Sequence, residues 1–260
     1  MSDPVLLETD GAIATLRLNR PDRKNAVGLE MRKFLRRLLT QIDRDPGIRV
    51  LILCGSGGSF CAGGDIRDMQ SLGSDGEAAR RRMRETGELA VTLSTLDIPV
   101  IAAVDGPAYG AGFGMALAAD FVLATPMARF CASFGRLGLV PDFALHHSLP
   151  RRVGVARAKE LVFSAREVDA TEALEIGLAD HIHPSEEIEA RARSMAGSFV
   201  TASPTALGLS KALLGQSFAL DIRQVTEAET AAQALCFTSE FHAAARARFL
   251  SGSRSGGGPA

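Results

Sequence analysis

Two glycine-rich turns are the parts of this chain whose residue types and spacing best suit chemistry. The first, residues 59–65 (SFCAGGD), directly follows the apolar run 49–54, and the second, residues 105–114 (DGPAYGAGFG), directly follows the apolar run 99–104. Glycine allows a tight turn and a close approach of two backbone segments. Two backbone N–H groups presented in this way could converge on one oxygen atom. Such an oxyanion site predicts acyl chemistry.

The same turns could instead bind a dinucleotide or phosphate, or serve only to shape the fold. The run GAGFG at residues 110–114 does not complete the G-x-G-x-x-G pattern of a dinucleotide site, and the chain has no G-x-x-x-x-G-K-S/T loop. A purely structural role is also disfavoured, because both turns stand in the same relation to two successive apolar runs.

The segments around the turns alternate between strand and helix patterns. Residues 50–53 and 100–104 are short, continuously apolar and rich in Val and Ile, as buried strands are. Residues 29–42 carry an apolar stripe at helical spacing, and residues 77–96 form a second long helix. The alternation predicts an α/β fold with a parallel core sheet. Further expected elements are a hairpin of 5–8 and 12–18, strands at 121–124 and 128–132, and helices at 115–119, 155–164, 170–176, 185–199, 205–216, 222–237 and 240–250.

From residue 155 onward we expect helices only. The chain is therefore divided into a core at residues 1–183 and a helical C-terminal part at residues 184–250. Residues 251–260 are rich in Gly and Ser and are predicted to be a disordered tail.

The helix at 77–96 is heavily basic at its start, where it carries Arg80, Arg81, Arg82 and Arg84. This cluster is interpreted as a solvated face, although a phosphate-bearing ligand could use it.

Composition and charge disfavour several classes of function. A formal net charge of −1, no Trp and one Tyr provide neither the field nor the stacking surfaces typical of nucleic-acid binding. No apolar run reaches the roughly 18 residues of a membrane span, and the first residues lack the pattern of a signal peptide, so a cytoplasmic location is expected. The four cysteines have no C-x-x-C spacing, and His181 and His183 have no third ligand nearby. Reduced thiols and no metal site are therefore expected.

Five blocks, taken in order, resemble the enoyl-CoA hydratase/isomerase family, which is also called the crotonase family. They are LNRP with KNA (residues 18–21 and 24–26), residues 59–65, residues 106–120, RLGLVP (residues 136–141), and the segment 169–179. The resemblance implies a crotonase-type α/β fold, a ββα spiral core whose C-terminal helices assemble a homotrimer or a dimer of trimers. It also implies an acyl-CoA substrate, with coenzyme A as part of that substrate and no separate cofactor. Phe249, in the last helix, is implied to reach toward the CoA site of a neighbouring subunit.

The resemblance also implies the roles of individual residues. The backbone N–H groups of Ala62 and Ala111 are implied to hold the thioester oxygen. Members of the family usually have Gly where Ala111 stands, but only the N–H is needed, so Ala can serve unless the turn requires a positive φ. The CoA moiety is implied to lie along Lys24, Asn25, Ala26, Ala62, Gly63, Gly64, Asp65 and Ile66.

The sequence departs from the hydratases at the residues that handle protons. Hydratases of the family hold water between two glutamates, and the matching positions here are Gly114 and Phe134. Neither side chain can transfer a proton, so slow or absent hydration is predicted.

Asp142 is the carboxylate that remains in this region. Its apolar neighbours Phe134, Leu139, Val140 and Phe143 would raise its basicity by desolvation. Some isomerases of the family shuttle a proton with a lone carboxylate near this point, and a dehalogenase branch uses an aspartate there as a nucleophile. Alternatively, Asp142 could be a helix N-cap. His146, four residues further on, could relay a proton or simply lie at the surface.

The leading hypothesis is double-bond isomerisation of an acyl-CoA through a stabilised enolate, with Asp142 moving the proton. Thioester hydrolysis or dehalogenation by nucleophilic attack of Asp142 is a second hypothesis. A third is an acyl-CoA-binding protein that has lost catalysis.

Overall fold

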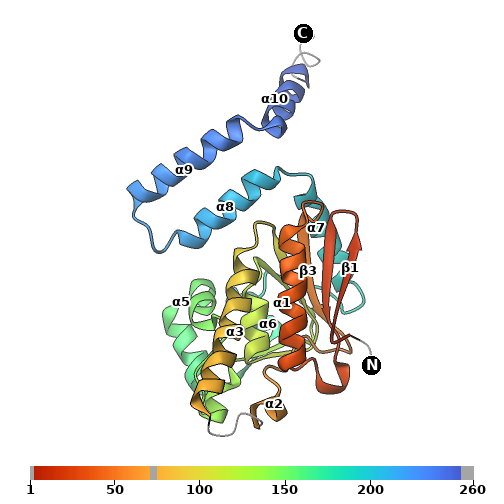
Figure 1. The fold of residues 1–260 in the computed structure, drawn as a ribbon, viewed down its shortest axis with the longest axis vertical. Coiled ribbons are helices and arrows are strands. Elements are labelled where there is room, and N and C mark those ends of the chain that lie inside the picture. The colour runs from red at the N-terminus through yellow and green to blue at the C-terminus, as the bar shows by residue number, and fades with distance from the viewer. Residues whose placement is uncertain (1–2, 71–74, 253–260) are drawn as a thin grey trace.

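A six-stranded sheet forms the centre of the fold in the computed structural model, which describes residues 3–70 and 75–252 (Figure 1). β1 is antiparallel to β2, and every other neighbouring pair in this sheet is parallel. The predicted hairpin is confirmed, and Gly11 at its turn has a φ of 56°. The strands, in their order across the sheet, are β1 (Val5–Asp10), β2 (Ile13–Leu18), β3 (Val50–Gly55), β4 (Val100–Val104), β6 (Phe121–Ala124) and β9 (His181–Ile182).

A second, three-stranded sheet lies beside the glycine turns. It contains β5 (Pro107–Tyr109), β7 (Arg129–Cys131) and β8 (Glu167–Asp169). The expectation of helices only after residue 155 is wrong at β8, because three residues are too short to display a strand period. β8 is recognisable only from its pairing with β7, which lies far earlier in the chain.

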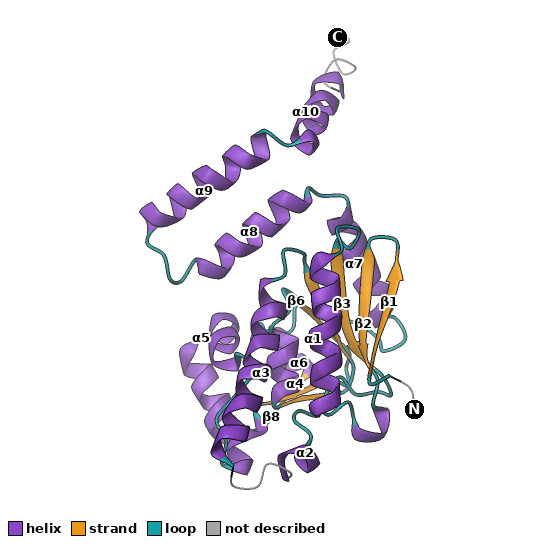
Figure 2. Ribbon diagram, in the orientation of Figure 1, coloured by secondary structure: helices purple, strands orange, loops and turns teal. Residues whose placement is uncertain are grey.

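Helices cover both faces of the large sheet (Figure 2). One face packs against α1 (Leu29–Arg44), α3 (Gly76–Thr95) and α4 (Ala111–Leu117) in the larger of two apolar clusters. Helix α4 begins before the expected residue 115, because the second glycine turn leads directly into its first turn. The remaining helices of the body are α2 (Ile66–Gln70), α5 (Leu145–Ser164) and α6 (Ala170–Glu175).

The opposite face is covered by α7 (Ile188–Val200). Its buried residues Ile188, Ala192 and Ala196 pack against Val50 and Ile52 of β3, among others. Helix α7 therefore belongs to the core, and the expected division after residue 183 is wrong, because the apolar stripe of α7 covers a sheet face that would otherwise be exposed.

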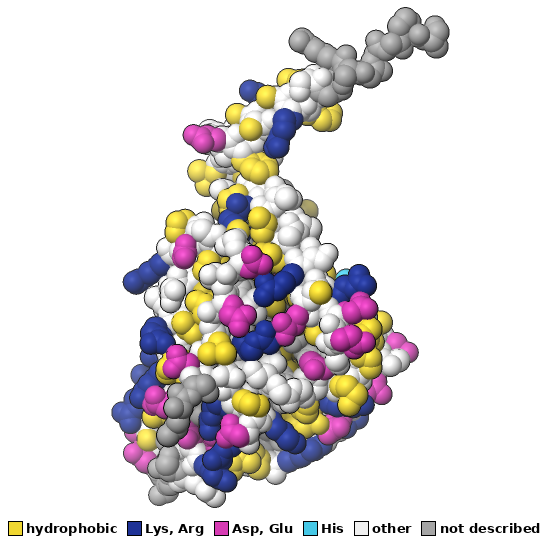
Figure 3. All heavy atoms as spheres, turned by 90° about the vertical axis from the view of Figure 1, so that its right-hand side faces the viewer, with side chains coloured by type: hydrophobic (Ala, Val, Ile, Leu, Met, Phe, Trp, Pro, Cys, Tyr) yellow, Lys and Arg dark blue, Asp and Glu magenta, His cyan; other side chains and the backbone are white. Residues whose placement is uncertain are grey.

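Helices α8 (Pro204–Gln216), α9 (Ile222–Phe237) and α10 (Glu240–Gly252) project from the body (Figure 1). Helix α8 is tied to the body by Lys211, whose Nζ lies 2.8 Å from an Asp120 carboxylate oxygen. Apolar side chains are exposed along this projection (Figure 3), including Phe218 at 76% and Phe249 at 78%. Of the predicted tail, residues 251 and 252 complete α10, and the rest lies outside the described residues.

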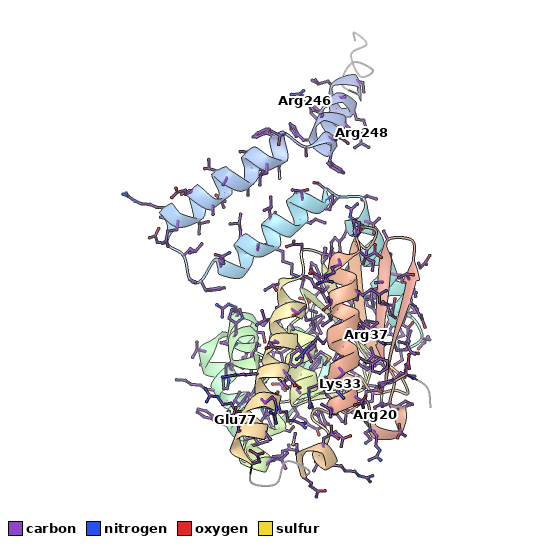
Figure 4. All side chains as sticks on the ribbon, viewed as in Figure 1. Arg20, Lys33, Arg37, Glu77, Arg246 and Arg248 are labelled. Atoms are coloured by element: carbon purple, nitrogen blue, oxygen red, sulfur yellow. The ribbon has the colours of Figure 1, made fainter. Side chains whose placement is uncertain are left out.

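The end of the body farthest from α10 carries α2 and the first turn of α3. Figure 4 places Arg20 and Glu77 at this end, and Arg246 and Arg248 on the distant α10. None of the helices in the described part of the chain combines the length and the hydropathy needed to cross a membrane.

Candidate active site

The two glycine turns lie side by side. The N–H of Cys61 donates to the Pro107 carbonyl at 2.9 Å, and the N–H of Tyr109 donates to the Cys61 carbonyl at 2.9 Å. Gly63 has a φ of 100°, and a Cβ there would lie 2.8 Å from the Tyr109 carbonyl oxygen. Only glycine therefore permits this close approach.

A cavity of about 460 Å³ opens between the turns, α3 and the segment before α5. Most of its lining is apolar, and among the described residues that line it Asp142 has the only carboxylate. The lining residues are Ala62, Gly63, Gly64, Ile66, Met69, Ala79, Arg82, Met83, Gly110, Ala111, Ser133, Phe134, Leu137, Leu139, Val140 and Asp142. A cavity of this size, apolar with a few polar groups, is typical of a small-molecule site.

The predicted role of the Ala62 N–H as an oxyanion donor is contradicted by the structure. This N–H donates to the Lys24 carbonyl at 2.9 Å, so it is already occupied.

Gly64, two residues further on, has the geometry that was expected of Ala62. Val27 donates to the Gly63 carbonyl at 2.7 Å and accepts from the Asp65 N–H at 3.2 Å. In such a parallel bridge the N–H of the intervening residue points away from the paired strand. The Gly64 N–H therefore points away from Val27, and Gly64 lines the cavity.

Ala111 supplies the matching donor from the second turn. It is the first residue of α4, where a backbone N–H has no partner within the helix. No described residue accepts a hydrogen bond from the N–H of Ala111 or of Gly64. The positive φ of the turn, 51°, falls on Gly110 and not on Ala111, so alanine is tolerated here. Gly64 and Ala111 therefore each offer an N–H group that has no acceptor among the described residues, one from each turn.

Asn25, which the resemblance placed against CoA, is buried inside the protein. Its Nδ2 donates to the carbonyls of Ser56 and Ser59 at 2.9 and 2.7 Å, and its Oδ1 accepts from the Arg20 N–H at 2.8 Å. With three hydrogen bonds inside the protein, this side chain cannot contact a ligand, so a CoA contact through it is excluded. Its function is to fix the first glycine turn to the preceding loop.

Of the other residues predicted to bind CoA, the cavity is lined by Ala62, Gly63, Gly64 and Ile66, and not by Lys24, Ala26 or Asp65. Lys24 is exposed and has a left-handed backbone, with a φ of 47°, and Ala26 is half-buried. Ile66 is 57% exposed and lines the cavity. Asp65 accepts a hydrogen bond from the Arg67 N–H and pairs with Arg20 at 3.2 Å. Burial opposes its ionisation, but these two contacts hold the pKa of Asp65 below its ordinary value.

Asp142 lines the cavity and has a carboxylate oxygen without a partner. Its Oδ1 is buried and has no hydrogen-bond partner among the described residues. Burial raises the pKa of Asp142 to about 6, and the positive charge of Arg82 opposes the rise. The backbone that follows is left-handed at Phe143 and Ala144, with φ of 51° and 56°, a conformation that is strained for residues other than glycine.

The alternative interpretation of Asp142 as a helix cap is wrong. Helix α5 begins at Leu145, its N-cap is Ala144, and no side chain caps it. Helix capping therefore does not account for an aspartate at this position.

The two positions predicted to correspond to the hydratase glutamates carry no acid. A Cβ at Gly114 would lie 2.7 Å from the Phe143 Cβ and 2.9 Å from the Phe143 carbonyl oxygen. A side chain as long as glutamate therefore does not fit at this position. The space is filled by the segment that carries Asp142. Phe134, at the second position, is an apolar wall of the cavity.

The histidines lie away from this cavity. His146 is exposed on α5 and lines a separate groove with Leu149 and Phe163, which gives no support to a proton relay with Asp142. The rings of His181 and His183 stack with centroids 5.9 Å apart. Within the described residues, no group of three or more metal-ligating side chains is present.

Comparison with known proteins identifies the family of this chain. The family model described as enoyl-CoA hydratase/isomerase matches residues 8–251. The chain belongs to this family. It is 34% identical to a crotonyl-CoA hydratase of Syntrophomonas wolfei over 91% of this chain and 90% of that protein. It is 37% identical to the 1,2-epoxyphenylacetyl-CoA isomerase of Escherichia coli over 81% of each.

A solved structure of an enoyl-CoA hydratase/isomerase from Cupriavidus metallidurans is 42% identical and superposes with a TM-score of 0.91. The match covers 96% of this chain and 94% of that structure. The α/β fold is therefore the crotonase fold, and the family is one of enzymes acting on acyl-CoA.

Proposed function

We propose that this protein is an acyl-CoA isomerase, which moves a carbon–carbon double bond along the acyl chain. The observation that carries the proposal is the unpaired carboxylate of Asp142, the only one among the described lining residues, in the cavity that also holds the Gly64 and Ala111 N–H groups. CoA is part of the substrate, and no separate cofactor is needed.

The reaction needs one proton acceptor and one oxyanion site. Asp142 accepts a proton from a carbon next to the double bond or the thioester, and the electron pair left behind is delocalised onto the thioester oxygen. The Gly64 and Ala111 N–H groups stabilise that oxygen, at about 3–4 kcal/mol for each donor. Asp142 then returns the proton to another carbon of the chain, so the proton and the charge both balance.

The environment of Asp142 suits a base at neutral pH. A carboxylate whose pKa is about 6 is ionised at pH 7 yet far more basic than an exposed aspartate. The relative named as a 1,2-epoxyphenylacetyl-CoA isomerase supports isomerisation of an acyl-CoA, and its named substrate is an epoxide. The relative named as a hydratase does not make hydration the better proposal, because Gly114 and Phe134 provide no acid to activate water.

The position of the Asp142 carboxylate on the cavity wall makes nucleophilic attack by Asp142 the second candidate. Thioester hydrolysis or dehalogenation would then pass through a covalent acyl- or aryl-enzyme on Asp142. An acyl-CoA-binding protein without catalysis is the third candidate.

Exchange of substrate protons for deuterium in deuterated water distinguishes the three candidate functions. The wild type and Asp142→Asn are incubated with saturated and enoyl-CoA thioesters, and deuterium is measured by mass spectrometry. The Asn variant should bind acyl-CoA as the wild type does but exchange at least about 10²-fold more slowly. A trapped adduct on Asp142 would establish the nucleophile, and equal exchange in both proteins would reject Asp142 as the base. Crotonyl-CoA hydration should be very slow in either protein.

We also propose that α8–α10 assemble a homotrimer or a dimer of trimers. The support is the row of exposed apolar side chains on a projection that has few contacts with its own body, among them Phe218, Leu235 and Phe249. Whether Phe249 reaches a neighbour's CoA site is part of this proposal. Multi-angle light scattering tests it, and a stable monomer at micromolar concentration would contradict it.

A further inference from the structure

Arg82 on α3 differs from the other arginines of its cluster. Arg80, Arg81 and Arg84 are exposed, but Arg82 is only 7% exposed and lines the same cavity as Asp142. The interpretation of the whole cluster as a solvated face is therefore wrong for this one residue. Its place on the helix turns it inward toward the cavity.

The side chain of Arg82 is largely buried, and its guanidinium has no direct partner among the described residues, although its nitrogens are not fully shielded from solvent. Within the described residues it has no hydrogen-bond acceptor and no carboxylate in ion-pair contact. A buried arginine of this kind loses part of its hydration without gaining a paired charge, which is unfavourable unless the cation has another use. Burial accordingly lowers the pKa of Arg82 below its ordinary value.

Four charged groups from neighbouring segments act on Arg82. Asp142 precedes α5, Asp65 precedes α2, and Asp68 lies on α2. Arg32 of α1 opposes Arg82 as a like charge, and it is itself paired with Glu85 at 3.6 Å. Asp65 is paired with Arg20, so it is partly neutralised. Among the described residues, Arg82 is the cation whose positive charge lowers the pKa of Asp142.

Arg82 also lies beside the first oxyanion donor. Its Nη2 is 3.8 Å from the point that a Cβ of Gly64 would occupy. The cation therefore stands near both ends of the proposed proton transfer, the Asp142 carboxylate and the turn that holds the thioester oxygen.

We infer that Arg82 is a positioning residue, a fixed positive charge that keeps Asp142 ionised and then balances the negative charge as it passes to the thioester oxygen. The inference rests on the proposed function. Before the transfer the negative charge is on Asp142, and afterwards Asp142 is neutral and the charge is on the oxygen at Gly64 and Ala111. A cation fixed near both positions stabilises the charge throughout without having to move, as electrostatic preorganisation requires.

Charge-neutral and charge-preserving variants test this inference. Arg82→Met removes the charge at similar volume, Arg82→Lys keeps it, and Arg81→Met makes the same change on the exposed side of α3. Proton exchange is measured against pH for each, with acyl-CoA affinity measured by calorimetry. In Arg82→Met the low-pH limb of the rate profile should move up by about one pH unit or more. The plateau rate should fall by about 10- to 100-fold with little change in KM.

Two comparisons decide between an electrostatic and a structural role. Arg82→Lys should recover most of the rate and the position of the limb, and Arg81→Met should match the wild type. If Arg82→Met proves unstable by circular dichroism, Arg82→Gln replaces it. A low-pH limb in the neutral variant that coincides with that of the wild type overturns the inference.

The proposed function fails in a different way from the inference. Its failure would be seen as wild-type exchange that is absent, or unaffected by Asp142→Asn. To keep the inference testable even then, the Asp142 carboxyl is titrated by carbon-13 NMR in the wild type and in Arg82→Met. Its pKa should be higher in the variant, and an equal pKa in both proteins would overturn the role of Arg82.

Discussion

Asp142→Asn should stabilise the folded protein at alkaline pH, although it removes a group that we place in the active site. The pKa of Asp142 is raised from 3.8 to about 6 in the folded protein, so the native state holds this proton more tightly than the unfolded chain does. The wild type therefore loses folding stability as the pH rises from about 4 to about 6, and the loss is complete above that range. About two pKa units at 1.36 kcal/mol each give a cost of about 3 kcal/mol at pH 8 and roughly half of that at pH 5.

The assay is urea unfolding of both proteins at pH 5 and pH 8, at one fixed protein concentration because assembly affects apparent stability. The advantage of the Asn variant in free energy of unfolding should be larger at pH 8 than at pH 5 by about 1–1.5 kcal/mol. Any effect of the new amide group that does not depend on pH cancels in this difference. Asp43→Asn, exposed on α1, is the matched control for the loss of one charge. An advantage that is equal at the two pH values, or larger at pH 5, would refute a desolvated Asp142.

Three further predictions concern packing and cysteine chemistry. Gly114→Ala should overpack the core, lowering the free energy of unfolding by about 1–3 kcal/mol and with it the unfolding temperature. Gly87→Ala, at a site where nothing lies within 4 Å of the added Cβ, should not lower the unfolding temperature. Equal unfolding temperatures for the two variants would contradict the crowding at Gly114. Asn25→Ala should lower the free energy of unfolding in urea by about 2–4 kcal/mol, because it leaves buried backbone groups unpaired. A loss below about 1 kcal/mol would argue against the internal role of Asn25. Burial raises the pKa of Cys61 to about 12, so iodoacetamide at pH 8 should alkylate the half-buried Cys236 before Cys61. Peptide mass spectrometry measures the order of labelling. Rapid labelling of Cys61 would show that the turn opens.

The sequence by itself determined the elements around the site. Continuous apolar runs at residues 50–53 and 100–104 predicted the two strands, and the glycines after them predicted two turns that come together. Both depend on local patterns, namely hydrophobic runs and the φ freedom of glycine, which can be recognised without a partner. The apolar neighbours of Asp142 likewise predicted a desolvated carboxylate.

Only the tertiary structure decided which groups in those elements are free. Ala62 and Gly64 lie in one short segment, but their N–H groups face opposite ways because residues 24–27 pair with one side of it. Arg82 looks like its exposed neighbours in the sequence, and its burial follows from how α3 is turned against the cavity. Hydrogen-bond direction and helix rotation are set by partners distant in the chain, so no local pattern records them.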